Sequence, residues 1–422
     1  MTHVPGTDRD QAVSELKFRD PVRARALIEA LGRRTAELGR APVSVMHVCG
    51  SHEQAIAKFG LRSTFPGGLN VIMGPGCPVC ITDTPEVDEG VILARQGVHI
   101  ATYGDMVRVP GTSMSLADAQ AEGAKIHVIY SAPQAVELAR STSDQVVFFA
   151  TGFETTAVAT AAVVLGGLPP NLSILSAHKY IPPVMEIVAE MPGTRVEGFL
   201  AAGHAATITG SAVFEPFVAR HGLPVVVAGF EPLDILAGLV KLVELIRDRT
   251  PQVVNMFPRC VTRDGNLRAQ EQLWRVFRPT GGRWRGIAHV PNGNLRLRDE
   301  FGSIDARRRF TIDLASLWDH APSALAQSCI CGDIMAGLSS PTDCKWFGQE
   351  CTPEKPVGAC MVSSKARARS GTSTAVILIW EATRDPPRIC RRQDRSQVRR
   401  RRTGHESLDR ARVPRRHRTR SG

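Results

Sequence analysis

Short apolar runs alternate with amphipathic segments along the first 250 residues of the chain. Short apolar strands that alternate with helices are typical of parallel sheets covered by helices on both faces. The pattern therefore predicts an α/β fold with two related parallel-sheet, Rossmann-like domains, at residues 41–140 and 141–250. Strands are predicted at 43–48, 71–73, 98–102, 126–130, 146–150, 172–176, 196–200 and 224–228, and helices at 53–59, 85–96, 115–123, 132–140, 155–165 and 232–247.

The two ends of the chain have different patterns. Residues 15–38 predict a helix with an apolar face and an arginine-rich face. We assign residues 1–40 to an N-terminal helical segment that packs with a C-terminal domain at residues 251–364. Within that domain, residues 329–364 are dense in cysteine, proline and glycine and cannot build a large core alone, so this region is expected to need a staple.

Positive charge gathers at the C-terminal end. Residues 365–422 hold 18 Lys and Arg against 5 Asp and Glu, while the whole chain carries +11, so residues 1–364 carry −2. A slightly acidic body does not favour nucleic-acid binding, and for the tail such binding is only a generic electrostatic option. No apolar run reaches about 18 residues, and residues 1–20 lack the apolar core of a signal peptide. The sequence therefore predicts a cytoplasmic protein without a membrane span.

Two cysteines lie in a tight loop that runs from Gly74 to Cys80. Thr84 is predicted to cap the helix that follows. A helix N-terminus beside the loop would lower the pKa of the Cys77 and Cys80 thiols and favour thiolate. Half of a structural zinc site is the alternative. Because the chain has no second Cys-x-x-Cys and Cys49 also follows a predicted strand, a thiol cluster for redox or metal chemistry is favoured.

Further reactive side chains come directly after predicted strands, at the edge where open parallel sheets bind ligands. They are His52 and Glu53 beside Cys49, then Glu154 and His204. His52 and Glu53 could orient ligands or move protons, or could simply supply polarity at a helix N-terminus. Glu154 is expected to face the same cleft, and His204 either does so or is a structural histidine. Nucleotide binding by a standard phosphate loop is disfavoured, since the chain has neither Gly-x-Gly-x-x-Gly nor a Walker A motif.

A second group of cysteines occupies a loop-like region near the end of the body. Structural disulfides are not expected in a reducing compartment, and all-thiolate ligation suits an iron–sulfur cluster or zinc. The spacing leaves both metals open. Cys260 is isolated and is expected to be a plain structural residue. The group consists of Cys329, Cys331, Cys344, Cys351 and Cys360.

Several long motifs follow one another along the chain: Cys49-Gly50-Ser51-His52-Glu53, Gly74-Pro75-Gly76-Cys77-Pro78-Val79-Cys80, Thr151-Gly152-Phe153-Glu154-Thr155-Thr156, Cys344 to Glu354, and Gly358-Ala359-Cys360-Met361-Val362-Ser363-Ser364. In this order they resemble the HypD family of [NiFe] hydrogenase maturation factors. The resemblance runs from about residue 15 to Ser364.

The resemblance implies an assembly scaffold rather than a conventional turnover enzyme. On it the Fe(CN)2CO group would be built, with a small HypC-type chaperone and a HypE-type cyanide donor as partners and the hydrogenase large subunit served indirectly. By motif, Cys49 would hold the iron, and Cys77 and Cys80 would form a redox-active dithiol near it. A [4Fe–4S] cluster in the C-terminal domain would be bound by Cys331, Cys344, Cys351 and Cys360.

Two other functions stay open on the residues. One is a thiol oxidoreductase, in which the cluster reduces Cys77 and Cys80 for a protein client. The other is a zinc-stapled binding module, which needs no chemistry at Cys49.

The resemblance ends abruptly after Ser364. The family usually continues with Glu-Gly and a further cysteine, whereas this chain continues with Lys365-Ala366-Arg367 and has no cysteine until Cys390. The arginine-rich segment 365–422 reads like an out-of-frame translation of a GC-rich gene. It is predicted to be mostly disordered, apart from a short apolar run at 376–380.

Overall fold

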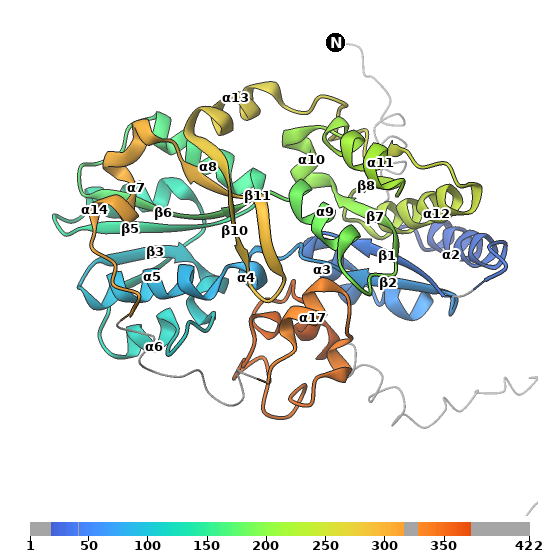
Figure 1. The fold of residues 1–422 in the computed structure, drawn as a ribbon, viewed down its shortest axis with the longest axis horizontal. Helices are drawn as coiled ribbons and strands as arrows, with labels where there is room; N and C mark the ends of the chain where they lie inside the picture. The colour runs from blue at the N-terminus through green and yellow to red at the C-terminus, as the bar shows by residue number, and fades with distance from the viewer. Residues whose placement is uncertain (1–17, 41, 316–327, 373–422) are drawn as a thin grey trace, which may run out of the picture. The chain divides into compact units, whose positions relative to one another are not determined.

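The computed structural model describes residues 18–40, 42–315 and 328–372, and within them the chain forms two mostly parallel sheets covered by helices (Figure 1). This confirms the α/β fold class. The first sheet has the order β2-β1-β7-β8-β9 and is parallel throughout. The second has the order β10-β11-β6-β5-β3-β4; β3 to β6 are parallel, whereas β10 pairs antiparallel with β11 and β11 pairs antiparallel with β6.

The strands of the first sheet are β1 (Val43–His47), β2 (Leu69–Met73), β7 (Val196–Ala202), β8 (Val225–Ala228) and β9 (Val253–Asn255). Those of the second are β3 (His99–Tyr103), β4 (Ile126–Ile129), β5 (Val146–Gly152), β6 (Leu172–Lys179), β10 (Phe277–Trp284) and β11 (Ala288–Leu297). The helices are α2 (Pro21–Ala36), α3 (Gly50–Lys58), α4 (Pro78–Ile81), α5 (Thr84–Arg95), α6 (Leu116–Ala121), α7 (Ala132–Arg140), α8 (Glu154–Leu165), α9 (Pro182–Glu190), α10 (Gly203–Thr209), α11 (Glu215–His221), α12 (Pro232–Asp248), α13 (Leu267–Val276), α14 (Ala306–Arg309) and α17 (Cys331–Ala336).

The two sheets do not follow the predicted ranges 41–140 and 141–250, because each sheet takes strands from both. β1 and β2 share a sheet with β7 to β9, in which β1 pairs with β7, and β3 and β4 share a sheet with β5 and β6, in which β3 pairs with β5. The two sheets therefore divide the chain differently from the sequence-based ranges. Local periodicity shows where strands lie but carries no information on which strands become neighbours.

The central strands are apolar because both of their faces are covered. Every residue of β1 and of β5 is buried, as expected for the middle of a parallel sheet. One buried cluster joins a face of each sheet and includes Cys49, Cys77 and Cys80. A second covers the other face of the β3–β6 sheet under α7, α8 and α13, and a third covers the other face of the β1–β2 sheet under α2 and α12.

The ends of the body pack differently from the expectation. α2 lies against α12 of the first sheet, with Arg34 Nε donating to Glu244 at 3.1 Å, and not against the cysteine-rich region. Residues 251–309 are divided between the two sheets, because β9 joins the first sheet and the β10–β11 hairpin joins the second, while Gly286 at the hairpin tip packs on Gly332 of the cysteine-rich region. The cysteine-rich region that the structure describes is residues 328–372.

The predicted disorder after Ser364 is wrong for the first residues of the tail. Residues 367–372 are helical, and Ala366, Ala368 and Ser370 are buried. Residues 373–422, with the apolar run at 376–380 and Cys390, lie outside the described residues. No helix in the described part of the chain is both long and apolar enough to cross a membrane.

Candidate thiol site

Cys49 lies at the carboxyl end of β1, directly before α3, and is buried. Its Sγ is 3.7 Å from Nδ1 of His204, which follows β7 in the first turn of α10. Burial has the largest effect on the pKa of Cys49 and raises it, but His204 and the backbone N–H groups of His52 and Ser51 together lower this pKa below its usual value. Burial lowers the pKa of His204, yet Cys49 and Glu154 outweigh it and the net direction is up. The pair is therefore suited to a thiolate beside an imidazolium.

The loop that carries Cys77 is packed directly against Cys49. The Gly50 N–H donates to the Gly76 carbonyl at 2.8 Å, and a Cβ at Gly76 would overlap the backbone of Cys49. Only glycine permits this approach of two backbones. The glycine of the motif thus brings the Cys-x-x-Cys loop beside Cys49, which the sequence could only suggest.

His52 and Glu53 are both buried and both held by other groups. His52 Nε2 lies 2.9 Å from the Gly229 carbonyl, and burial lowers the pKa of His52 to about 3, so the ring is neutral near pH 7. Glu53 contacts His47 Nε2 at 3.0 Å and accepts two hydrogen bonds from Arg62, at 2.8 and 2.6 Å. Burial raises the pKa of Glu53, but His47 and Arg62 lower this pKa by more than burial raises it. The net pKa is below the usual value, so the side chain is a carboxylate. This geometry favours anchoring over proton transfer for both residues, and a proton-transfer role stays a prediction.

Glu154 is the first residue of α8, which follows β5 of the second sheet, and its charge raises the pKa of His204. Its Oε1 accepts the Ile181 N–H at 2.9 Å, while its buried Oε2 has no hydrogen-bond partner among the described residues. Burial raises the pKa of Glu154 to about 7. A carboxyl group that is half-protonated near neutral pH can hold or release a proton beside the Cys49–His204 pair.

Cys77 and Cys80 lie at the start of α4, a single turn that Thr82 closes by donating to the Pro78 carbonyl at 2.8 Å. The pKa of Cys80 is raised well above its usual value, first by burial and then by Cys77, Cys331 and Cys360. The predicted lowering of the pKa by the helix dipole is therefore wrong for Cys80, because burial and neighbouring sulfurs outweigh one short turn. The cap of the next helix is Asp83 instead of Thr84, with Glu86 closing a capping box.

The five cysteines of the C-terminal region lie close to one another. Cys331 interacts with Cys329 and Cys360, and Cys351 interacts with Cys329 and Cys344. Two of the sulfurs accept backbone N–H groups, Cys331 from Cys360 at 3.2 Å and Cys351 from Val357 at 3.3 Å. A Cβ at Gly358 would lie 2.8 Å from Cys329 Sγ, so the backbone approaches the sulfurs closely there. Clustered thiols with N–H donors to sulfur fit an iron–sulfur cluster, and the donor set also suits zinc.

A family model described as "HypD: Hydrogenase formation hypA family" matches residues 23–370. The chain belongs to the HypD family. It is 39% identical over 362 residues to the hydrogenase maturation factor HypD of Azotobacter vinelandii, covering 83% of this chain and 93% of that protein. The HypD proteins of Cupriavidus necator and Rhodobacter capsulatus are 39% and 36% identical, covering 76% and 83% of this chain and 86% and 94% of theirs.

The HypD family match extends to residue 370, past Ser364, where the motif resemblance ends. The structure gives a reason, since residues 365–370 contact the Cys49 region. Ser370 Oγ donates to Glu53 Oε1 at 2.6 Å, and a Cβ at Gly50 would lie 2.9 Å from Lys365 Cβ. The first residues of the tail therefore belong to the folded body.

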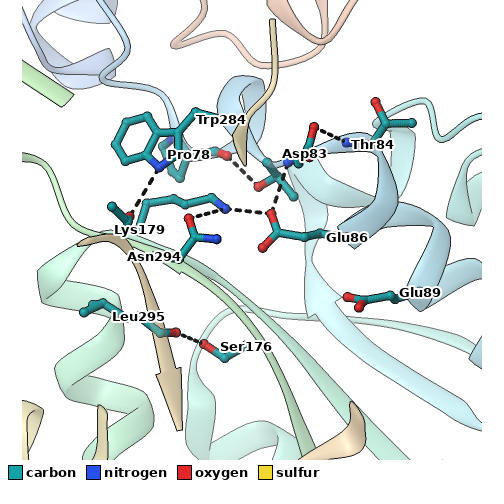
Figure 2. Close-up of polar contacts among 12 residues, drawn as sticks. Pro78, Asp83, Thr84, Glu86, Glu89, Ser176, Lys179, Trp284, Asn294 and Leu295 are labelled. Carbon is teal, nitrogen blue, oxygen red and sulfur yellow. Dashed lines mark hydrogen bonds and ion pairs between the residues drawn. The ribbon is translucent and has the colours of Figure 1, made fainter. Parts of the chain in front are cut away.

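A buried polar network ties the segment after α4, the turn that carries Cys77 and Cys80, to the second sheet (Figure 2). Lys179 is fully buried and donates to Glu86 at 2.7 Å and to Asn294 at 2.9 Å. Glu86 Oε2 also accepts the Asp83 N–H at 3.1 Å, in the short segment between α4 and α5. The network thus fixes the start of α5 directly after Cys80.

Sequence reasoning missed several polar residues that this HypD family chain places at or near the thiols. His47 and Arg62 bind Glu53, and Lys179 binds Glu86. His47 and Lys179 lie inside apolar strands, and only their polarity at otherwise apolar positions could have marked them. Arg285 lies in a segment rich in arginine, where nothing in the sequence distinguishes it from its neighbours.

Proposed function

We propose that this chain is a hydrogenase maturation factor that serves as the scaffold for assembly of the Fe(CN)2CO group, with Cys49 as the thiolate that holds the iron. Iron with cyanide and CO ligands needs a soft thiolate anchor and open coordination positions. The single observation that carries the proposal is the placement of Cys49: 3.7 Å from His204 and in backbone contact with the Cys-x-x-Cys loop.

We also propose that Cys77 and Cys80 form a redox-active dithiol and that Cys331, Cys344, Cys351 and Cys360 hold a [4Fe–4S] cluster. A cluster of this kind supplies electrons one at a time when it is bound. The interaction of Cys80 with Cys331 and Cys360 supports electron exchange between the Cys77–Cys80 pair and the C-terminal cysteine group. The protein's own part is to bury the sulfurs and to donate N–H groups to them.

The residues around Cys49 would handle protons and position ligands. Glu154, with its pKa raised to about 7, is suited to exchange a proton through His204 with a ligand at Cys49. The names of the relatives place them in hydrogenase maturation. For this chain we accordingly propose a HypC-type chaperone and a HypE-type cyanide donor as partners, action on the hydrogenase large subunit through them, and a cytoplasmic location.

The test is an infrared spectrum of anaerobically purified protein that has been co-expressed with its small chaperone. We expect cyanide and CO stretching bands in the parent and none in Cys49→Ala. Cys260→Ala is the matched control, since Cys260 is exposed. It should keep both bands. Bands that persist in Cys49→Ala would overturn the role of Cys49, and their absence from a parent that holds iron and sulfide would overturn the scaffold.

The second candidate function is a thiol oxidoreductase that uses the Cys77–Cys80 dithiol on a protein client. The interaction of the two thiols with each other, and of Cys80 with Cys331, favours it. On this reading Cys49→Ala leaves reduction of a client disulfide intact, while Cys77→Ala and Cys80→Ala each abolish it. A zinc-stapled binding module would instead contain zinc and show no redox change.

A further inference from the structure

The tip of the β10–β11 hairpin, residues 285–287, lies between two thiol sites: the Cys77–Cys80 loop and the C-terminal cysteine group. The Arg285 N–H donates to the carbonyl of Ile81, the residue after Cys80, at 3.0 Å. The next residue, Gly286, packs on Gly332, and a Cβ at Gly332 would overlap the Gly286 carbonyl. The backbone of Arg285 therefore contacts the residue after Cys80, and its neighbour Gly286 contacts the residue after Cys331.

The side chain of Arg285 is held without a carboxylate partner. Its Nη2 donates to the Pro110 carbonyl at 2.7 Å, and its Nε is buried and has no hydrogen-bond partner among the described residues. After its own burial, the groups that act most strongly on its charge are Cys331, Asp83, Asp88 and Cys80. Arg285 also acts on Cys329. The charge of Arg285 therefore acts on sulfurs of the Cys77–Cys80 loop and of the C-terminal cysteine group.

The Arg285 side chain is partly buried and its buried Nε lacks a partner, which is costly unless negative charge lies nearby. Asp83 and Asp88 act on this charge, but neither forms an ion pair with Arg285 in the described chain. The sulfurs of Cys80, Cys329 and Cys331 also act on it. They contribute negative charge when they are thiolates or metal ligands.

We propose that Arg285 supplies positive charge to the C-terminal cysteine group and thereby sets the potential at which a cluster bound there accepts an electron. The inference rests on the proposed function in one respect, the presence of a [4Fe–4S] cluster on Cys331 and its partners. Adding one electron adds one negative charge, with no bond formed or broken. In surroundings of low dielectric a fixed guanidinium stabilises that charge, so loss of the guanidinium makes reduction harder.

The test is a reductive titration of the anaerobic full-length protein with dithionite, followed by electron paramagnetic resonance, with iron and sulfide measured for each variant. We expect Arg285→Gln to lower the equilibrium constant for reduction about tenfold, a shift of about 59 mV to more negative potential. Arg285→Lys keeps the charge and should stay near the parent. Arg283→Gln is the matched control, because Arg283 lies on the same hairpin and is exposed.

The outcomes separate the inference from the proposed function. An unshifted potential in Arg285→Gln with iron and sulfide retained would overturn the inference alone. If Arg285→Gln loses the cluster, Arg285→Lys decides: retention at the parent potential supports the charge, and loss shows that the hydrogen bond to Pro110 is what matters. A parent chain without iron and sulfide would overturn the cluster and the inference together.

Discussion

At the scale of single residues, two buried glutamates show how partners decide charge. Glu53 and Glu154 each follow a strand and are each almost fully buried. Glu53 has His47, Arg62 and Ser370 around it, and its pKa is lowered. Glu154 has one backbone N–H, and burial raises its pKa to about 7. The same side chain is therefore a fixed carboxylate at one site and a proton donor or acceptor at the other.

The raised pKa of Glu154 makes the fold less stable at neutral pH than at acidic pH. A carboxyl whose pKa is higher in the folded chain than in the unfolded one contributes stability below the unfolded value, and this contribution is lost as the pH rises through about 7. A shift from 4.5 to about 7 corresponds to about 3 kcal/mol. We expect Glu154→Gln to gain about this much stability relative to the parent between about pH 4 and about pH 8.

The measurement is the free energy of unfolding in urea at several pH values. Glu137→Gln serves as the control, because Glu137 is exposed and forms no ion pair among the described residues. A Glu154→Gln variant whose stability runs parallel to that of the parent would contradict the raised pKa.

At the scale of elements, a buried ion pair joins β6, α5 and β11 next to α4, the turn that carries Cys77 and Cys80. Lys179 ends β6, Glu86 lies in the first turn of α5, and Asn294 lies in β11. Both charges are buried, with Arg296 as a second partner of Glu86 at 3.0 Å. Such a pair adds little net stability over an apolar replacement, but removal of Lys179 leaves the buried Glu86 carboxylate dependent on Arg296.

We therefore expect Lys179→Met to lower the free energy of unfolding by about 3 kcal/mol or more, because Glu86 loses its shortest contact. The double variant Lys179→Met with Glu86→Gln should recover part of that loss. Lys125→Met is the matched control, since Lys125 forms an exposed ion pair with Asp144 and should cost about 1 kcal/mol or less. Urea unfolding measures all three, and equal losses for Lys179→Met and Lys125→Met would refute the role of the buried pair.

At the scale of the whole molecule, the two sheets interleave along the chain. Strand β1 pairs with β7, whereas β3, which follows β1 and β2 directly, pairs with β5 in the other sheet. The described chain up to residue 372 also falls within one compact unit. Each sheet needs strands from both halves of the sequence.

Fragments cut at residue 140 should consequently not fold. We expect residues 41–140 and residues 141–250, expressed separately, to show no cooperative transition in urea, because β1 and β3 each lose a neighbouring strand. The intact chain under the same conditions is the control. A cooperative transition in either fragment alone would show that the sheets are less dependent on each other than their pairing indicates.

The sequence by itself determined the α/β class, most strands to within a few residues, and the cysteines, because short apolar runs and Cys-rich motifs are local features. It also determined the family, since several motifs occur in order. It could not supply strand neighbours, which depend on contacts between distant segments. Each sheet takes strands from both predicted ranges, and α2 packs on α12.

Only the tertiary structure decided the electrostatic environment of the site. The approach of His204 to Cys49, the pKa of Cys80, and the position of Arg285 between two groups of thiols all depend on residues far apart in the chain. The helix dipole that the sequence predicted for the dithiol is a local effect. Burial and neighbouring sulfurs, which arise only when the chain folds, are stronger there.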